Sequence, residues 1–283
     1  MPSRERSTPA GEHRPVLLNE VVEHLRPQSG GVYVDTTVGW GGHAVELLRR
    51  AGPSGQLIGM DLDADNLSRA KERLAEVGHP FALHHGNFAG LQAILAGHGI
   101  DRVDGILADL GMSSMQIDAP ERGFSYVRDG PLDMRMDRSR GQTAAELLAR
   151  ISEEELRQAL LELADEPEAE RIAAAIVAVR GHQPLQRTKE LAQLIVDTLY
   201  PGHHGRWRIH PRRDEWKTHP AARTFQALRI LVNRELANLR QLLRLLPASL
   251  RPGGRAVLIA FHSGEDRLIK AAFREGVRAG MYR

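Results

Sequence analysis

The chain has 283 residues, of which 42% are hydrophobic and 26% are charged, with a formal net charge of +2. This composition is typical of a folded globular protein and excludes a wholly disordered chain. No apolar run approaches the roughly 20 residues of a membrane span. The absence of cysteine excludes disulfides, thiolate metal sites and cysteine nucleophiles. We therefore expect a cytoplasmic protein that does not enter membranes, with residues 1–14 as a flexible polar tail.

Short β-rich runs alternate with helix patterns over the first 110 residues. The predicted strands cover residues 31–35, 57–61, 81–84 and 103–109. The predicted helices cover residues 16–26, 43–51, 64–77 and 88–98. Alternation at this spacing predicts right-handed βαβ units around a parallel sheet.

This alternation is lost over residues 110–142 and returns near the end of the chain. Capping boxes at Thr143–Glu146 and Ser152–Glu155 predict the first helices of a purely helical stretch. From Phe225 to Leu246, apolar residues recur at steps of three and four, which predicts one long amphipathic helix. A last strand is predicted over residues 255–261.

The predicted fold is therefore a doubly wound, mostly parallel α/β core with an inserted all-helical domain. We expect the core to consist of residues 15–111 and 220–283. The insertion is expected over residues 112–219.

The first predicted strand leads into a glycine-rich turn. Asp35 closes the strand, and Gly39, Gly41 and Gly42 follow before the next helix. Glycines there allow a sharp turn and a close approach of the backbone to a ligand. Asp61 closes the second strand, where a carboxylate can bind the hydroxyls of a ribose. NAD and S-adenosyl-L-methionine both remain open as ligands, and the acid before the glycines favours the cationic methyl donor.

The fourth predicted strand ends at another acid, Asp109, at the edge where open α/β sheets bind ligands. Its carboxylate can accept a hydrogen bond from an exocyclic amine, with the hydroxyls of Ser113 and Ser114 close by in sequence. Asn87 and Phe88 follow the third strand and can contact an adenine ring. Each of these residues also fits an ordinary structural role in a turn or a helix cap.

A basic segment precedes the predicted long helix. Between Arg206 and Arg223 lie six basic residues and two acids, with several histidines in or beside the run. Such a stripe can neutralise phosphates, although charge alone favours a solvated loop.

Seven motifs in this order resemble those of the RsmH (MraW) family, from about residue 13 to residue 272. They are His13–Leu18, Asp109–Ser114, Glu121–Tyr126, Asp129–Asp137, Arg187–Leu191, His219–Arg229 and Phe261–Arg267.

The resemblance implies a class I methyltransferase core that uses S-adenosyl-L-methionine. It implies methylation of N4 of a cytosine in the decoding centre of 16S ribosomal RNA, within the assembled small ribosomal subunit. The implied catalytic residues are Asp109 and Ser113, and no metal ligands are implied. The implied donor-binding residues are Gly41, Gly42, His43, Asp61, Phe88, Asp109 and Gln116.

The resemblance also bears on how the RNA is recognised. It implies that the helical insertion and the basic segment contact RNA. Phe124, Tyr126, Met134 and Arg135 are candidates for lining a pocket for an extruded base, with core packing as the alternative for methionine. A homodimer is a further possibility that the sequence leaves open.

Three features depart from the family pattern. Thr36 stands where a glycine or alanine is usual, and Gly264 replaces a leucine. The chain ends at Arg283, several tens of residues before family members usually finish. The short end keeps open the alternative of a donor-binding but inactive RNA-binding or ribosome-assembly protein. A nicotinamide-dependent dehydrogenase is a separate alternative, which Asp35 and the absence of a third glycine disfavour.

Overall fold

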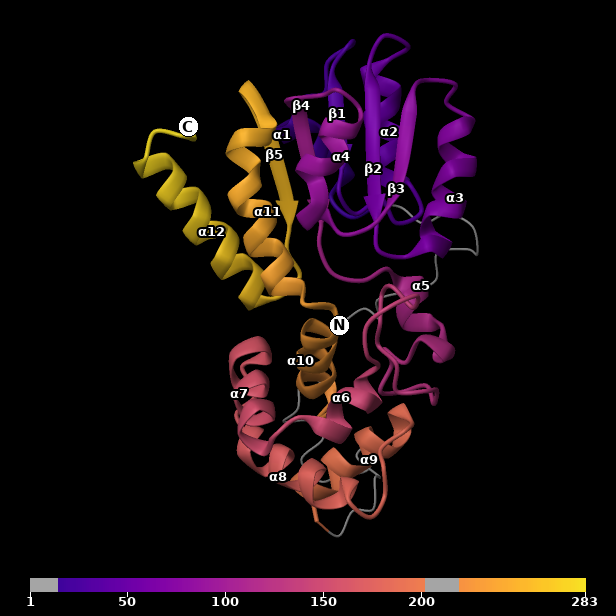
Figure 1. Ribbon diagram of the computed structural model, residues 1–283, viewed down its shortest axis with the longest axis vertical. Coiled ribbons are helices and arrows are strands. Elements are labelled where there is room, and N and C mark those ends of the chain that lie inside the picture. Colours follow the sequence, from indigo (N-terminus) through magenta and orange to yellow (C-terminus); the bar gives the residue numbers. More distant parts are fainter. Residues whose placement is uncertain (1–14, 202–218) are drawn as a thin grey trace, which may run out of the picture. The chain divides into compact units, whose positions relative to one another are not determined.

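A computed structural model describes residues 15–201 and 219–283 (Figure 1). These residues form two compact units. The first comprises the chain up to Leu110 together with Asn238–Phe261 and Ile269–Arg283. The second comprises Gly111–Ala237 and His262–Leu268. The sequence predicts that the core resumes at residue 220, whereas residues up to Ala237 belong to the second unit.

The first unit is built on five parallel strands in the order β3-β2-β1-β4-β5. The strands are β1 (Val32–Asp35), β2 (Gln56–Asp61), β3 (Phe81–His85), β4 (Val103–Asp109) and β5 (Leu250–Ile259). Each predicted strand is present, and the doubly wound parallel sheet is confirmed. β1, β2 and β4 are largely apolar because both faces of the sheet are covered.

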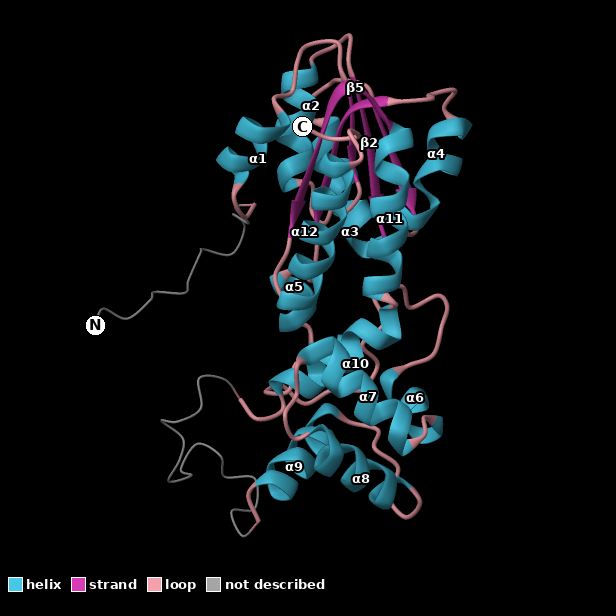
Figure 2. Cartoon of the chain, turned by 90° about the vertical axis from the view of Figure 1, so that its left-hand side faces the viewer, coloured by secondary structure: helices cyan, strands magenta, loops and turns pink. Residues whose placement is uncertain are grey.

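Helices cover both faces of this sheet. α1 (Leu18–Leu25) and α2 (Gly42–Ala51) lie on one face, and α4 (Leu91–Gly97) and α11 (Glu235–Ser249) lie on the other (Figure 2). α3 (Ala64–Ala75) shares the buried cluster of α1 and α2, and α12 (Ser263–Arg278) follows β5. Where these layers meet, Val34, Leu57 and Leu107 are fully buried.

The prediction of one long helix is wrong in one respect, because the segment forms two helices. α10 (Ala222–Asn233) ends at Arg234, whose φ of 53° is left-handed, and α11 begins at Glu235. The Arg234 amide bonds back to the carbonyls of Ile230 and Leu231, which closes α10. Apolar spacing continues across the break, so periodicity alone gives no sign of it.

α10 explains the shifted boundary between the units. Its buried side chains, Phe225, Ala227 and Leu228, belong to the hydrophobic cluster of the second unit. The helix therefore packs with the helical unit and not with the sheet, to which the sequence analysis assigned it.

In the described part of the second unit, the regular secondary structure is helical apart from one isolated bridge between Pro131 and Arg187, and residues 123–143 are irregular. Its other helices are α5 (Ser114–Asp118), α6 (Ala144–Arg150), α7 (Glu153–Ala164), α8 (Ala169–Arg180) and α9 (Thr188–Leu199). The two predicted capping boxes are confirmed at the starts of α6 and α7. Among the described residues, no helix combines the length and apolarity needed to cross a membrane.

The long segment before α6 is fixed to α10 by one amide side chain. Asn233 Oδ1 accepts from the Met136 amide at 2.7 Å, and its Nδ2 donates to the Met134 carbonyl at 2.8 Å. Met134 is fully buried in the core of this unit, and Phe124 is 5% exposed in the same cluster. Both side chains therefore fill the core, which corrects their candidate role in a base pocket.

Replacing Asn233 tests this attachment. We expect Asn233→Ala to lower the free energy of unfolding by about 1–3 kcal/mol, because it leaves partly buried backbone groups of Met134 and Met136 without their partner. Urea denaturation followed by circular dichroism measures the change. Gln193→Ala removes an exposed amide on α9 and serves as the control, with an expected change within about 0.5 kcal/mol. Equal effects of the two substitutions would contradict the role given to Asn233.

Candidate functional site

Three carboxylates close three neighbouring strands of the sheet. Asp35 ends β1, Asp61 ends β2 and Asp109 ends β4. β1 lies between β2 and β4, and the order of the strands reverses at β1 and β4. Ligands of open α/β sheets bind beyond the carboxyl ends of the strands at such a reversal. The candidate site of the first unit is therefore the group of residues around these three acids.

Asp35 is the most deeply buried of the three, at 1% exposed. Its Oδ1 accepts from the Thr37 amide at 3.1 Å, whereas its Oδ2 is buried with no hydrogen-bond partner among the described residues. Burial raises the pKa of this carboxyl to about 7, and the charges of Asp109 and Asp61 add to the increase. A positive charge placed beside Asp35 would stabilise its ionised form.

Asp61 holds the turn that follows β1. Its Oδ2 accepts from the Gly39 amide at 2.7 Å, and its Oδ1 accepts from the Asp63 amide at 2.8 Å and from Asn66 Nδ2 at 3.3 Å. Burial raises the pKa of Asp61, and these hydrogen bonds oppose the increase. A carboxylate offers about four acceptor positions, so hydroxyls of a ligand can still bind to it.

The turn between β1 and α2 has the geometry that the glycines predict. Gly39 and Gly41 have φ values of 53° and 81°, which other residues rarely adopt. α2 then begins at Gly42 without a side-chain cap, so the amides of its first turn are available to a ligand. A Cβ on Gly42 would lie 3.1 Å from Pro15 Cγ, which indicates close packing on that side of the turn.

His43 connects α2 to Asp109. Its Nε2 lies 2.9 Å from the carbonyl oxygen of Val16, and a carbonyl only accepts, so Nε2 carries the proton. Its Nδ1 lies 3.7 Å from Asp109 Oδ2. His43 is 6% exposed, and the hydrogen bond to Val16 holds its ring.

Two threonines complete this site, and sequence reasoning missed the role of one. Thr37 Oγ1 accepts from the Asp109 amide at 2.6 Å while the Thr37 amide donates to Asp35, so one residue connects the ends of β1 and β4. The available signal was a threonine two positions after an acid at the end of a strand. The neighbouring Thr36 donates its hydroxyl to the Leu107 carbonyl at 2.9 Å, which accommodates its side chain in the sheet.

Phe88 follows β3 by three residues, and the last residue of β3, His85, pairs with Asp61 of β2. The Gly86 amide donates to the Asp61 carbonyl at 2.9 Å, and Phe88 begins the short helix η1 (Phe88–Gly90) two residues later. Asn87 caps η1 by accepting from the Ala89 amide at 2.8 Å, as predicted for a helix start at this position. The Phe88 side chain is only partly buried, so its ring is available to a ligand.

Ser113 and Gln116 belong to the second unit, where they cap α5 together. The Gln116 amide donates to Ser113 Oγ at 3.2 Å, and the Ser113 amide donates to Gln116 Oε1 at 3.1 Å. Gln116 is 7% exposed. This reciprocal cap gives both residues a structural role, and their expected contacts with donor and substrate stay predictions.

Arg206–Lys217, most of the basic segment, lie outside the described residues. Of the candidates for a base pocket, Tyr126 stacks on His219 with ring centroids 4.7 Å apart. Arg135 forms an ion pair with Asp133 at 2.7 Å. The structure thus gives both a partner within the second unit.

One further group resembles a metal centre but has the hydrogen bonding of an ion-pair network. Ligand atoms of Glu235, His262 and Glu265 lie within 4.8 Å of one another. Both oxygens of Glu235 accept from Arg229 at 2.8 Å. His262 Nδ1 accepts from the Gly264 amide at 3.2 Å, so Nε2 carries the proton and has no lone pair for a metal.

The family model described as the MraW methylase family matches residues 10–281. The chain belongs to this family. It is 49% identical over 267 residues to a protein of Syntrophotalea carbinolica named ribosomal RNA small subunit methyltransferase H, covering 94% of this chain and 82% of that protein. The protein of the same name from Trichlorobacter lovleyi is 47% identical over 264 residues, covering 93% and 81%.

Membership of the MraW methylase family makes this protein a methyltransferase and excludes the dehydrogenase alternative. S-Adenosyl-L-methionine is the methyl donor that the family implies, and the site suits it. The donor is cationic at sulfur, and Asp35 offers a buried oxygen with no partner among the described residues. The glycine turn and Asp61 suit the nucleoside part of the donor.

The raised pKa of Asp35 predicts how stability depends on pH. The folded protein keeps this proton up to a pH of about 7, whereas the unfolded chain releases it near 4. The contribution of Asp35 to stability is therefore full below pH 4 and is lost as the pH rises to 7, by up to about 1.4 kcal/mol per pH unit.

Urea denaturation of the ligand-free protein at several pH values measures this effect. In Asp35→Asn we expect the loss of stability between pH 5 and pH 8 to be smaller than in the unmodified protein, because no charge forms at this position. Asp101→Asn, at an exposed position, is the control and should leave the pH dependence unchanged. Parallel curves for Asp35→Asn and the unmodified protein would refute the raised pKa.

Proposed function

We propose that this protein transfers a methyl group from S-adenosyl-L-methionine to N4 of a cytosine in the decoding centre of 16S ribosomal RNA. The observation that carries the proposal is the buried Oδ2 of Asp35 at the strand reversal, which has no hydrogen-bond partner in the part of the chain that the structure describes. The relatives named as ribosomal RNA small subunit methyltransferases support ribosomal RNA as the substrate class. The assembled small subunit in the cytoplasm is the proposed partner and place of action.

Donor binding uses residues of the first unit in this proposal. The amides after Gly41 and Gly42 approach the donor, Asp61 accepts from its ribose and Phe88 contacts its adenine. His43, whose ring is held by the Val16 carbonyl, is a further donor contact beside Asp109. Gln116 is the remaining residue that the family resemblance assigns to donor binding.

S-Adenosyl-L-methionine supplies an activated methyl group on a cationic sulfur. The protein then has to orient the amine that receives it. Asp109 accepts a hydrogen bond from the exocyclic amine and directs the nitrogen lone pair towards the methyl carbon, and Ser113 provides a second polar contact. Positioning and exclusion of water then supply most of the rate increase.

Replacing Asp61 tests donor binding. We expect Asp61→Ala to weaken binding of S-adenosyl-L-methionine by about 1–3 kcal/mol, because charge-assisted bonds to the ribose are lost and the Gly39 turn loses its anchor. Isothermal titration calorimetry gives the affinity, and thermal unfolding shows whether the variant is folded. The exposed acid Asp101, changed to Ala, should leave the affinity as it is. An unaltered affinity in Asp61→Ala would rule out this role.

Replacing Asp109 tests the transfer step. We expect Asp109→Ala to lower turnover by about 100-fold or more, with a much smaller effect on donor affinity, because the amine loses its acceptor. Small ribosomal subunits lacking the modification are incubated with protein and donor, and nucleoside mass spectrometry measures N4-methylcytidine. Full methylation by the variant would show that Asp109 is misassigned. No methylation by the unmodified protein would favour the inactive RNA-binding alternative.

A further inference from the structure

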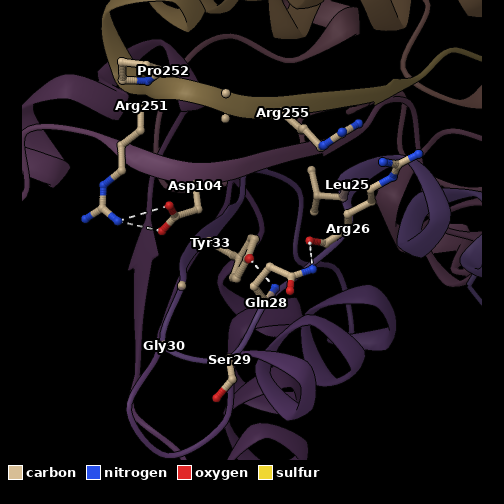
Figure 3. A pocket seen from close by; sticks show the side chains of 13 residues that line it. Leu25, Arg26, Gln28, Ser29, Gly30, Tyr33, Asp104, Arg251, Pro252 and Arg255 are labelled. Carbon is tan, nitrogen blue, oxygen red and sulfur yellow. Dashed lines mark hydrogen bonds and ion pairs between the residues drawn. The ribbon is translucent and has the colours of Figure 1, made fainter.

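A separate cavity of about 460 Å³ lies at the opposite, amino-terminal edge of the sheet (Figure 3). It is lined by the end of α1, the turn before β1, the start of β4 and the first half of β5. The lining side chains used below are those of Arg26, Gln28, Tyr33, Asp104, Arg251 and Arg255. All of them belong to the first unit, and none belongs to the methyl-transfer site.

The charge of this cavity is positive. Three arginines line it against one carboxylate, which gives a formal charge of +2. Arg251 Nη1 forms an ion pair with both oxygens of Asp104, at 3.1 and 2.9 Å. Arg26 and Arg255 are exposed, and their guanidinium groups extend to the same side of the cavity in Figure 3.

Arg255 is anchored and still has donors for a ligand. Its Nη1 donates to the His24 carbonyl at 3.2 Å, which uses one of the five N–H groups of a guanidinium. The Arg26 carbonyl accepts from Gln28 Nε2 at 3.0 Å, so the backbone that carries the second arginine is also held. The two side chains thus project from fixed backbone.

The floor of the cavity is fixed in the same way. Tyr33 accepts from the Gln28 amide at 2.6 Å, and Asp104 Oδ2 accepts from the Val32 amide at 2.8 Å. A Cβ on Gly31 would lie 2.6 Å from the Tyr33 hydroxyl, and one on Gly254 would lie 2.9 Å from the Arg251 carbonyl. Glycine at these two positions lets the backbone pack closely around the cavity.

Forked guanidinium donors on a fixed backbone are the groups that proteins use for phosphate. We propose that this cavity binds a phosphate group of the RNA backbone, as an accessory contact to the substrate. This inference rests on the proposed function, because it takes the RNA from there. Asp104 and Asp109 are five residues apart on β4, which is about 17 Å of strand. The contact therefore holds RNA away from the reacting base.

The double substitution R26Q/R255Q tests the proposal. R240Q/R244Q, at two exposed arginines of α11 that do not line the cavity, removes the same charge and is the matched control. Methyl transfer to small ribosomal subunits is measured over a range of subunit concentrations. For R26Q/R255Q we expect KM to rise about tenfold with kcat unchanged, and the slope of log affinity against log salt to fall by about 1–2. The affinity for S-adenosyl-L-methionine and the Tm should match those of the control.

Equal KM values and salt slopes for the two double variants would overturn the proposal. Pyrophosphate binding, measured by calorimetry, distinguishes a small ligand from RNA. If the unmodified protein binds pyrophosphate, R26Q/R255Q does not, and the affinity for subunits is the same in both, the cavity binds a free phosphate compound and the RNA assignment is wrong. Direct binding of the subunits, measured by filter retention, keeps the two proposals apart. If the unmodified protein retains the subunits but transfers no methyl group, and R26Q/R255Q retains fewer subunits, the proposed function is refuted. The same result supports the phosphate site in the cavity.

Discussion

The burial of Asp35 at the end of β1 is the constraint on which the site depends. One oxygen of this carboxylate has no hydrogen-bond partner among the described residues, and two further acids are close by. Its burial therefore lowers the stability of the ligand-free protein. Thr37 offsets part of that cost through its amide and links Asp35 to Asp109 through its hydroxyl. A cationic ligand removes the remaining cost, because it supplies the charge that the protein does not. The buried Asp35 carboxylate therefore destabilises the ligand-free protein and favours binding of the cationic donor.

Much of the first unit could be predicted from the sequence. Strands β1 to β4 are short, mostly apolar runs, three of which end at an acid, and helix patterns fill the segments between them. Asp35, Asp61 and Asp109 could be grouped because the ends of parallel strands meet at one edge of a sheet. Thr37 was missed because its role depends on a hydrogen bond to a residue 72 positions away, and a threonine two positions after a strand-ending acid does not by itself identify that partner.

The second unit was harder to predict for a related reason. The break at Arg234 lies in the backbone conformation of one residue, while the apolar period passes through it unchanged. Phe124 and Met134 lie in a segment without periodicity, where an aromatic ring or a thioether suits a ligand pocket as well as a core. Only their burial in the shared cluster with α10 decides between the two. The donor and substrate roles of Ser113 and Gln116 depend on bound ligands and stay predictions.

The parallel sheet explains why a methyl-transfer site and a phosphate site can coexist in one unit. Its carboxyl edge gathers Asp35, Asp61 and Asp109, and its amino edge gathers Arg26, Arg251 and Arg255. Opposite charges brought together would pair with each other, as Arg251 and Asp104 do, and neither would be available to a ligand. The length of the strands keeps the two groups beyond the screening distance of about 8 Å at physiological salt. A cationic donor and an anionic RNA backbone can then bind to one small unit without competing for the same charges.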